Sequence, residues 1–235
     1  MSGKTSTRVN LNGLIFYVDA SNSNSYTVTN LIDLIGFRTG TITGTTYNSL
    51  NGGNLSFNGT TDYIYYPFDD IFKVSYTTID CWINPTSVGN MATLFSTFDF
   101  SDYDIGQTPT GFALTWGNNT FSFYYADGGT AGALKTSAST SIIGKWTNIV
   151  LVYDGTTTKF YLNGNLLTSV SASGPINWTY SPPIVTHATI GRKSINVLSI
   201  PGYFPGKIAS VKVYNRALSA SELIENYNKF YTRFN

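Results

Sequence analysis

The sequence predicts an all-β protein, a sandwich or barrel of short strands, with one helix at the C-terminus. Aromatic residues make up 15% of the 235 residues, and such β-forming side chains are interspersed with turn-forming Gly, Asn and Ser. Turn signals recur at short intervals, among them Asn12-Gly13, Asn58-Gly59, Asp154-Gly155 and Asn163-Gly164. Short strands separated by such turns are typical of sandwiches and barrels.

Runs with period-two alternation or dense β-forming residues lie between these turns. We expect strands at residues 14–18, 54–58, 63–66, 76–83, 93–98, 112–116, 121–126, 146–153, 159–162, 166–171, 187–191 and 207–214. Asn163-Gly164 predicts a type I′ hairpin, because both residues tolerate positive φ. Residues 149–152 are apolar on both faces, so their strand is expected to be covered on both sides. The polar segment 36–53 is expected to be a long surface connection.

One helix is predicted at about residues 219–231. Ser219-Ala220-Ser221-Glu222 is a capping box, in which Ser219 and Glu222 satisfy each other's backbone N–H groups. Leu218 and Leu223 occupy the two positions of a hydrophobic staple. The expected apolar stripe consists of Leu223, Ile224, Tyr227 and Tyr231. Such an amphipathic helix should lie on the sandwich or against a partner.

Charge and cysteine content exclude several classes of protein. Charged residues make up 11% of the chain and the net charge is +1, which argues against nucleic-acid binding and against polybasic attachment to a membrane. No apolar run approaches the roughly 20 residues that a membrane helix needs. Cys81 is the single cysteine, so an intrachain disulfide and a cysteine-based zinc site are excluded.

A single domain is expected at residues 13–235, because no change in composition marks a linker. Residues 1–12 are polar and lack a core pattern, so they are expected to form an N-terminal arm. The first residues lack the apolar stretch of a signal peptide, and synthesis in a cytoplasm is therefore expected.

Several stretches of this sequence resemble the laminin G-like, concanavalin A-type jelly-roll family, and they occur in the same order as in that family. They are residues 13–20, 55–64, 79–83 with a strand ending in Trp82, 146–155, 160–164, 190–192, 204–208 and 211–219. The resemblance covers nearly the whole chain and implies a two-sheet antiparallel jelly roll, a fold often used to bind carbohydrate or to decorate a larger assembly. Residues 19–22 and 214–219 are especially similar to versions found in tailed-phage virion proteins.

One position departs from this family. Relatives usually carry Asp directly after the isoleucine that matches Ile208, whereas this chain has Ala209. Ala209 alternates with Val211 and Val213, so we expect it on an apolar face. The common structural calcium site of the family is therefore not expected here.

A separate candidate for Ca²⁺ is the acidic loop at residues 99–104. Asp99, Asp102 and Asp104 offer the oxygen ligands that this hard ion prefers. The alternative interpretation is a solvated acidic turn between strands.

Catalysis is not expected from the residues present. Glycoside hydrolysis needs two carboxylates that flank the bond, and the only glutamates, Glu222 and Glu225, belong to the predicted helix. His187 is the sole histidine and lies in an apolar run without a nucleophile elbow nearby. We interpret it as a structural residue.

Exposed aromatic rings are the candidate sugar-binding groups, since a flat ring suits the C–H-rich face of a sugar. The same rings would also suit protein–protein contacts. Several of ten aromatics are expected on loops or polar strand faces, whereas Trp82 and Trp146 are expected in the core. The ten are Tyr63, Tyr65, Tyr66, Tyr103, Tyr124, Tyr125, Trp178, Tyr180, Tyr203 and Phe204. The residues proposed as sugar-binding are Tyr103, Tyr124, Tyr125, Trp178, Tyr180 and Tyr203.

These observations lead to one hypothesis and two alternatives. The hypothesis is a non-enzymatic virion protein of a tailed phage, a capsid decoration or a head or tail appendage, that presents a carbohydrate-binding surface to host glycans. Other virion proteins would dock on the N-terminal arm or the C-terminal helix, and a homo-oligomer is left open. The alternatives are a free bacterial carbohydrate-binding module and a glycoside hydrolase.

Overall fold

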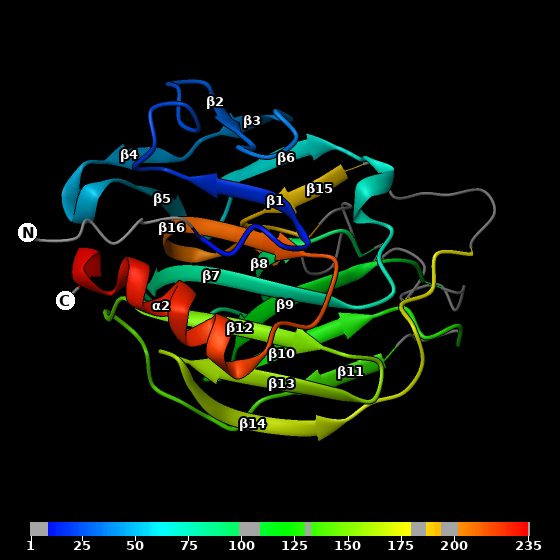
Figure 1. Cartoon of the computed structure of the whole chain (residues 1–235). Helices are drawn as coiled ribbons and strands as arrows, with labels where there is room; N and C mark the ends of the chain where they lie inside the picture. Colours follow the sequence, from blue (N-terminus) through cyan, green and yellow to red (C-terminus); the bar gives the residue numbers. More distant parts are fainter. Residues whose placement is uncertain (1–8, 99–108, 130–132, 180–186, 194–201, 235) are drawn as a thin grey trace, which may run out of the picture.

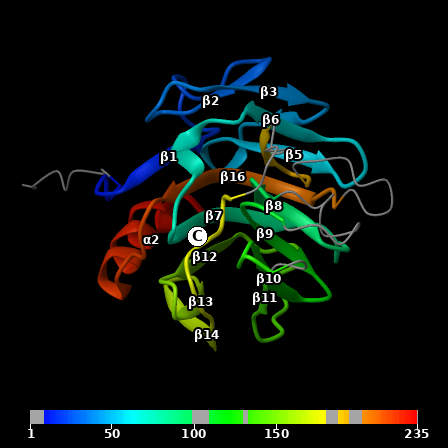
Figure 2. The same cartoon turned by 90° about the vertical axis from the view of Figure 1, so that its right-hand side faces the viewer.

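The computed structural model describes residues 9–98, 109–129, 133–179, 187–193 and 202–234, and these form a two-sheet antiparallel sandwich with one C-terminal helix (Figure 1). Figure 2 shows three layers: helix α2 (Ala220–Phe234), then sheet A, then sheet B. The predicted fold class is therefore confirmed.

Each sheet contains eight strands within the described ranges. Sheet A has the order β14-β13-β12-β7-β16-β5-β4, with β1 also paired to β16. Its strands are β1 (Leu14–Asp19), β4 (Thr46–Asn48), β5 (Asn54–Asn58), β7 (Thr77–Pro85), β12 (Thr147–Tyr153), β13 (Thr157–Leu162), β14 (Asn165–Ser171) and β16 (Pro205–Tyr214).

Sheet B has the order β11-β10-β9-β8-β15-β6-β3-β2. Its strands are β2 (Asn30–Ile32), β3 (Thr39–Thr43), β6 (Tyr63–Pro67), β8 (Ala92–Ser96), β9 (Phe112–Gly117), β10 (Thr120–Tyr125), β11 (Ala133–Thr136) and β15 (His187–Ile190). Two short 3₁₀ turns, η1 (Leu50–Gly52) and η2 (Asp70–Phe72), lie in the connections.

The turn between β13 and β14 has the predicted geometry. Asn163 and Gly164 have φ values of 50° and 78°, as a type I′ turn requires. The expectation for residues 36–53 is wrong, because β3 and β4 lie within this segment. These short strands bury few side chains and so lack hydrophobic alternation. Gly40 allows β3 to pass close to the Tyr66 ring, which a Cβ at that position would meet at 2.2 Å.

The main core fills the space between the two sheets. The Phe16 ring is fully buried and lies 5.0 Å from Tyr66 and 5.6 Å from Phe95, measured between ring centroids. These three rings come from β1, β6 and β8, so the core links the two sheets directly. Cys81 is also fully buried here, and burial raises the pKa of its thiol.

A second apolar layer lies between sheet A and α2. Trp82 is 1% exposed and its ring stacks on Phe234 at 4.3 Å and on Tyr227 at 5.7 Å. Val150 and Val152 of β12 point into this layer, while other β12 residues point into the main core. The prediction that this strand is covered on both sides is confirmed, and α2 is the second cover.

Helix α2 begins as predicted. The Ser219 N–H donates to Glu222 Oε2 at 2.8 Å, and the Glu222 N–H donates to Ser219 Oγ at 3.4 Å. Hydrogen bonds from Arg216, followed by those of Ser219, lower the pKa of Glu222 to about 2 despite partial burial. Leu218 and Leu223 are both buried in the second apolar layer.

The predicted apolar stripe of α2 is partly wrong. The residues that α2 buries are Leu223, Asn226, Phe230 and Phe234, whereas Ile224 and Tyr231 are 47% and 45% exposed. Asn226 lies on the buried face because its side chain donates to Tyr214 Oη at 2.9 Å. A prediction of the buried face that considers only apolar residues therefore misses Asn226.

A buried ion pair lies beneath α2. Lys212 of β16 and Asp80 of β7 are directly opposite each other, with Nζ 3.4 Å from Oδ2 and almost no exposure of either side chain. Asn148 donates to the other carboxylate oxygen of Asp80 at 2.8 Å. The Phe230 ring centroid lies 4.2 Å from the Lys212 ammonium, so a cation–π contact completes its surroundings.

Ala209 lies on an apolar face, as predicted, but not on the face that Val211 and Val213 share. The register of β16 against β7 shifts between Ile208 and Ser210, which places an extra residue on one strand. Ala209 therefore faces the layer beneath α2, whereas Val211 and Val213 face the main core. A β-bulge of this kind breaks simple alternation.

Val9 and Asn10, the first described residues of the expected arm, pack on the domain. Val9 is 7% exposed within the layer beneath α2, and the Asn10 N–H donates to Asn226 Oδ1 at 3.1 Å. No helix within the described ranges is long and apolar enough to cross a membrane.

Candidate functional site

A shallow hollow of about 240 Å³ lies on sheet B, where β6 and β15 run side by side. It is on the face of sheet B that points away from sheet A, so it lies on the opposite side of the molecule from α2 (Figure 2). Its lining consists of Tyr63, Tyr65, His187, Thr189 and Arg192.

Strand alternation places these side chains on one face. In β6, Ile64 and Tyr66 are fully buried in the main core, so Tyr63 and Tyr65 point the other way. In β15 the register pairs Thr189 with Tyr65. The hollow is therefore formed by two neighbouring strands rather than by a loop.

The rings in the hollow form a continuous aromatic surface. Tyr63 and Tyr65 have centroids 6.3 Å apart, and the His187 imidazole stands edge-on to Tyr65 at 5.2 Å. Tyr203 lies beside this group, with its centroid 6.4 Å from that of Tyr63. All four residues are partly exposed.

Arg192 closes one side of the hollow. Gly191 has a φ of +86°, and a Cβ there would lie 2.5 Å from the Phe57 ring, so this turn requires glycine. The Thr189 hydroxyl donates to the Arg192 carbonyl at 2.8 Å, and Arg192 Nε donates to the Lys193 carbonyl at 3.1 Å. These bonds hold the guanidinium carbon 4.2 Å from the Tyr63 ring centroid.

The electrostatics of the hollow are simple at neutral pH. Burial, and to a lesser extent the charge of Arg192, lower the pKa of His187 from its ordinary value of 6.5. The imidazole is therefore neutral at pH 7, and Arg192 is the one charged side chain in the lining. The hollow combines ring faces with hydroxyl, imidazole and guanidinium groups, which can hydrogen-bond a polyhydroxylated ligand while a ring packs against it.

Two of the predicted sugar-binding residues are wrong. Tyr125 is 1% exposed and its ring packs in the main core 4.7 Å from Tyr153. Tyr124 lies on the outer face of β10 but is 9% exposed, because it packs with Phe98 in a small separate cluster. Neither ring presents a face that a sugar could cover.

Trp178 has a packing role in the structure. Its Nε1 donates to the Val74 carbonyl at 2.9 Å, and its ring lies 5.9 Å from Phe68 and 6.1 Å from Phe112. It is partly buried and does not line the hollow.

The other predicted site residues divide into two groups. Tyr203 lies beside the hollow, as described above. Tyr103, Tyr180 and the candidate calcium ligands Asp99, Asp102 and Asp104 lie outside the described residues. Within the described ranges, no group of three or more His, Cys, Asp or Glu side chains could hold a metal ion.

Sequence reasoning missed Arg192 and Thr189, and it interpreted His187 as structural. The apolar neighbours Ala188 and Ile190 do point into the main core, whereas His187 lines the hollow. The usable signal was the alternation of Tyr63 and Tyr65 around buried Ile64. No local pattern, however, places Arg192 opposite these rings, because it comes from a turn distant in sequence.

The family is decided by a match over most of the chain. The model of the concanavalin A-like lectin/glucanases superfamily, Laminin_G_3, matches residues 58–224. The chain belongs to this superfamily. Among curated proteins, none matches this concanavalin A-like chain.

Solved structures with the same fold include proteins of several kinds. Domain 4 of an extracellular arabinanase from Geobacillus stearothermophilus, in complex with arabinotriose, has 18% identity and a TM-score of 0.65, and the match covers 91% of this chain and 98% of that one. A Trypanosoma rangeli sialidase in complex with sialic acid has 17% identity and a TM-score of 0.63, covering 92% and 32%.

Botulinum neurotoxin type C, whose cell entry depends on interaction with two ganglioside molecules, has 12% identity and a TM-score of 0.67. That match covers 93% of this chain and 51% of the neurotoxin chain. The concanavalin A-like chain thus spans about a third of the sialidase and half of the neurotoxin chain. At these identities the similarity shows the fold alone.

Proposed function

We propose that this chain is a non-enzymatic carbohydrate-binding domain and that the hollow of Tyr63, Tyr65, His187, Thr189 and Arg192 holds a sugar ring. The observation that carries the proposal is the pair of partly exposed tyrosine rings beside hydrogen-bonding side chains. A sugar presents C–H groups on one face and hydroxyls around its edge, so it needs both kinds of surface.

The size of the hollow supports a small ligand. Its volume of about 240 Å³ is below the roughly 300 Å³ at which pockets for drug-sized ligands begin. The hollow is open, so further sugar units of a chain can extend over the sheet.

Binding without hydrolysis is the proposed activity. Most glycoside hydrolases need a pair of carboxylates at the bond that is broken, and the hollow is lined by Tyr, His, Thr and Arg. The fold is compatible with sugar binding, since the similar arabinanase domain was solved in complex with arabinotriose and cell entry of the similar neurotoxin depends on interaction with two ganglioside molecules.

Replacing Tyr65 by alanine tests the site. Binding to a glycan array should weaken by at least about tenfold, which corresponds to about 1.4 kcal/mol, because the variant loses the ring between Tyr63 and His187. The matched control is Tyr231→Ala, which removes a 45% exposed tyrosine on α2. Affinity is measured by calorimetry on array hits. Equal loss in both variants, or no binding by the folded wild type, would contradict the proposal.

We further propose that the domain serves in a tailed-phage virion, as a capsid decoration or a head or tail appendage, with its hollow directed to host glycans. The similarity of residues 19–22 and 214–219 to phage virion proteins supports this setting. Figure 2 shows sheet B and α2 on opposite sides of sheet A, and the hollow lies on the outer face of sheet B. Docking through the helix or the N-terminal arm would therefore leave the hollow exposed.

Deleting residues 1–8 tests the docking role of the arm. The deletion should abolish incorporation into particles without lowering the melting temperature, because it stops before Val9 and Asn10, which pack on the domain. Mass spectrometry of purified particles measures incorporation. As a control, Val9→Asp should lower the melting temperature, since it places a charge in an apolar layer. Particles that incorporate the deletion variant normally would disprove docking through the arm.

A further inference from the structure

We propose that the sugar bound in the hollow is acidic and that Arg192 binds its carboxylate. This inference rests on the proposed sugar site and goes beyond it by naming the ligand class. Three observations support the inference. Arg192 lies in the hollow, it has no acidic partner among the described residues, and its two Nη atoms form no hydrogen bond to a described residue.

Arg192 differs from the other arginines that the structure describes. Arg38, Arg216 and Arg233 each form an ion pair with a carboxylate, at 2.6 Å, 2.5 Å and 2.8 Å respectively. Arg192 forms no ion pair with any residue in the described ranges and contacts the Tyr63 ring instead. Charged residues make up only 11% of this chain, so an arginine in a hollow without a carboxylate is a feature that needs an explanation.

The geometry leaves the two Nη atoms of Arg192 available to a ligand. Its Nε donates to the Lys193 carbonyl, and the Tyr63 ring lies against the guanidinium at 4.2 Å. These contacts orient the group and reduce the entropy lost when it binds. The two Nη atoms form no hydrogen bond to a described residue, and a carboxylate accepts two parallel hydrogen bonds from such a fork.

The rest of the lining carries no negative charge that would repel an anion. The aromatic rings and Thr189 carry no negative charge, and His187 is neutral at pH 7, so nothing in the lining repels a carboxylate. Tyr63 and Tyr65 can support the ring of the sugar while its acidic group reaches Arg192. A neutral sugar would make the ring contacts but would offer the guanidinium only uncharged hydroxyl oxygens, which accept weaker hydrogen bonds than a carboxylate does.

The test uses pairs of ligands that differ by one carboxylate. Affinities for sialyllactose and lactose, and for oligogalacturonate and its methyl ester, are measured by calorimetry with wild type, Arg192→Met and Arg192→Lys. In at least one pair, wild type should bind the acidic member about tenfold or more tightly, the gain expected for a charge-assisted hydrogen bond. Arg192→Met should remove this preference, and Arg192→Lys should keep part of it, because lysine retains the charge but not the fork.

Lys145→Met is the matched control, since it removes the same charge from an exposed position. It should leave the preference intact. Sulfated lactose distinguishes carboxylate recognition from general anion binding and should bind less tightly than the preferred carboxylate ligand.

Three outcomes would overturn the inference: equal affinity within each pair, equal loss of preference in Lys145→Met and Arg192→Met, or tighter binding of the sulfated sugar. If wild type binds neutral and acidic sugars equally through Tyr65, the proposed function stands and only the acidic class is wrong. If folded wild type binds no sugar at all, both are wrong. Thermal melts of each variant ensure that folded proteins are compared.

Discussion

Replacing Lys212 by methionine is expected to destabilise the protein by about 3–5 kcal/mol, the cost of leaving one partner of a buried ion pair alone. The Lys212 side chain is 0% exposed and that of Asp80 is 2% exposed. Without the ammonium, the Asp80 carboxylate would retain the hydrogen bond from Asn148 but would have no counter-charge beneath α2. Methionine fills a similar volume, so the loss would come from the charge.

Urea denaturation measures this loss of stability. Lys73→Met is the matched control, because Lys73 also pairs with an aspartate but is 41% exposed, and such pairs contribute about 0–1 kcal/mol. The double variant Lys212→Met, Asp80→Asn should recover most of the loss, since it removes the stranded charge. If the double variant is as unstable as Lys212→Met, packing rather than charge holds this region.

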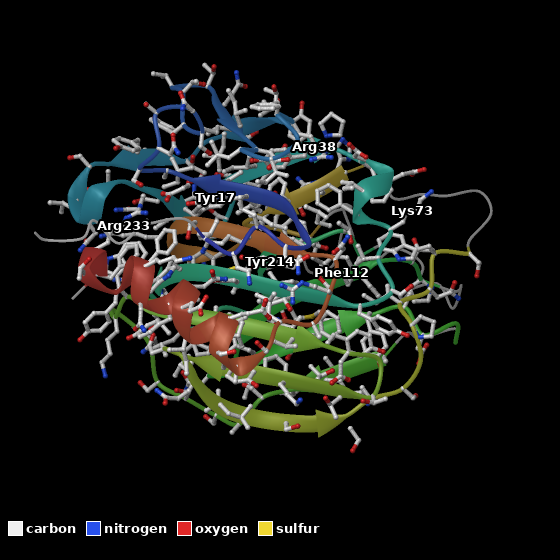
Figure 3. All side chains as sticks on the ribbon, viewed as in Figure 1. Tyr17, Arg38, Lys73, Phe112, Tyr214 and Arg233 are labelled. Carbon is white, nitrogen blue, oxygen red and sulfur yellow. The ribbon has the colours of Figure 1, made fainter. Side chains whose placement is uncertain are left out.

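Replacing Arg233 by methionine is expected to destabilise the protein by about 2–4 kcal/mol, because the residue holds the last turn of α2 to distant parts of the chain. Its Nη1 lies 2.8 Å from Asp19 Oδ1, its Nε donates to the Asn51 carbonyl at 2.6 Å, and its Nη2 donates to the Gly53 carbonyl. Figure 3 shows Arg233 at the end of α2 that faces these segments. The remaining donors to Asp19, from Ser21 and Tyr17, would not replace the charge.

The lysine variant separates charge from geometry. Arg233→Lys keeps a cation near Asp19 but cannot reach three acceptors at once, so it should recover only part of the stability. Thermal and urea unfolding of both variants give the comparison, and hydrogen exchange locates the change. Protection should fall first in α2 and in residues 50–54. A wild-type melting curve for Arg233→Met would show that the helix end does not depend on this contact.

Local chemistry explains which parts of the fold could be predicted from the sequence. The hairpin at Asn163-Gly164 depends on two neighbouring residues that tolerate positive φ, and the start of α2 depends on Ser219 and Glu222. Both are decided within a few residues, so the sequence predicts them correctly. The apolar density of β12 likewise indicates that both of its faces are covered.

Predictions failed where a distant contact decides the outcome. Tyr125 is of a residue type that often binds sugars, but its ring packs on Tyr153 of another strand. Ala209 has the predicted apolar surroundings, but the bulge in β16 puts it on the opposite face from Val211 and Val213. Asn226 is polar by type yet buried, because the Tyr214 hydroxyl accepts its hydrogen bond.

The candidate hollow shows the same division. The sequence alone indicates an aromatic, low-charge jelly roll with a strand at residues 63–66, and local alternation along such a strand puts Tyr63 and Tyr65 on the same face. Only the tertiary structure brings β15 beside β6 and places the Arg192 guanidinium over the Tyr63 ring. Which strands become neighbours depends on burial of the whole core rather than on any short stretch of residues. The site exists because that burial pairs β6 with β15.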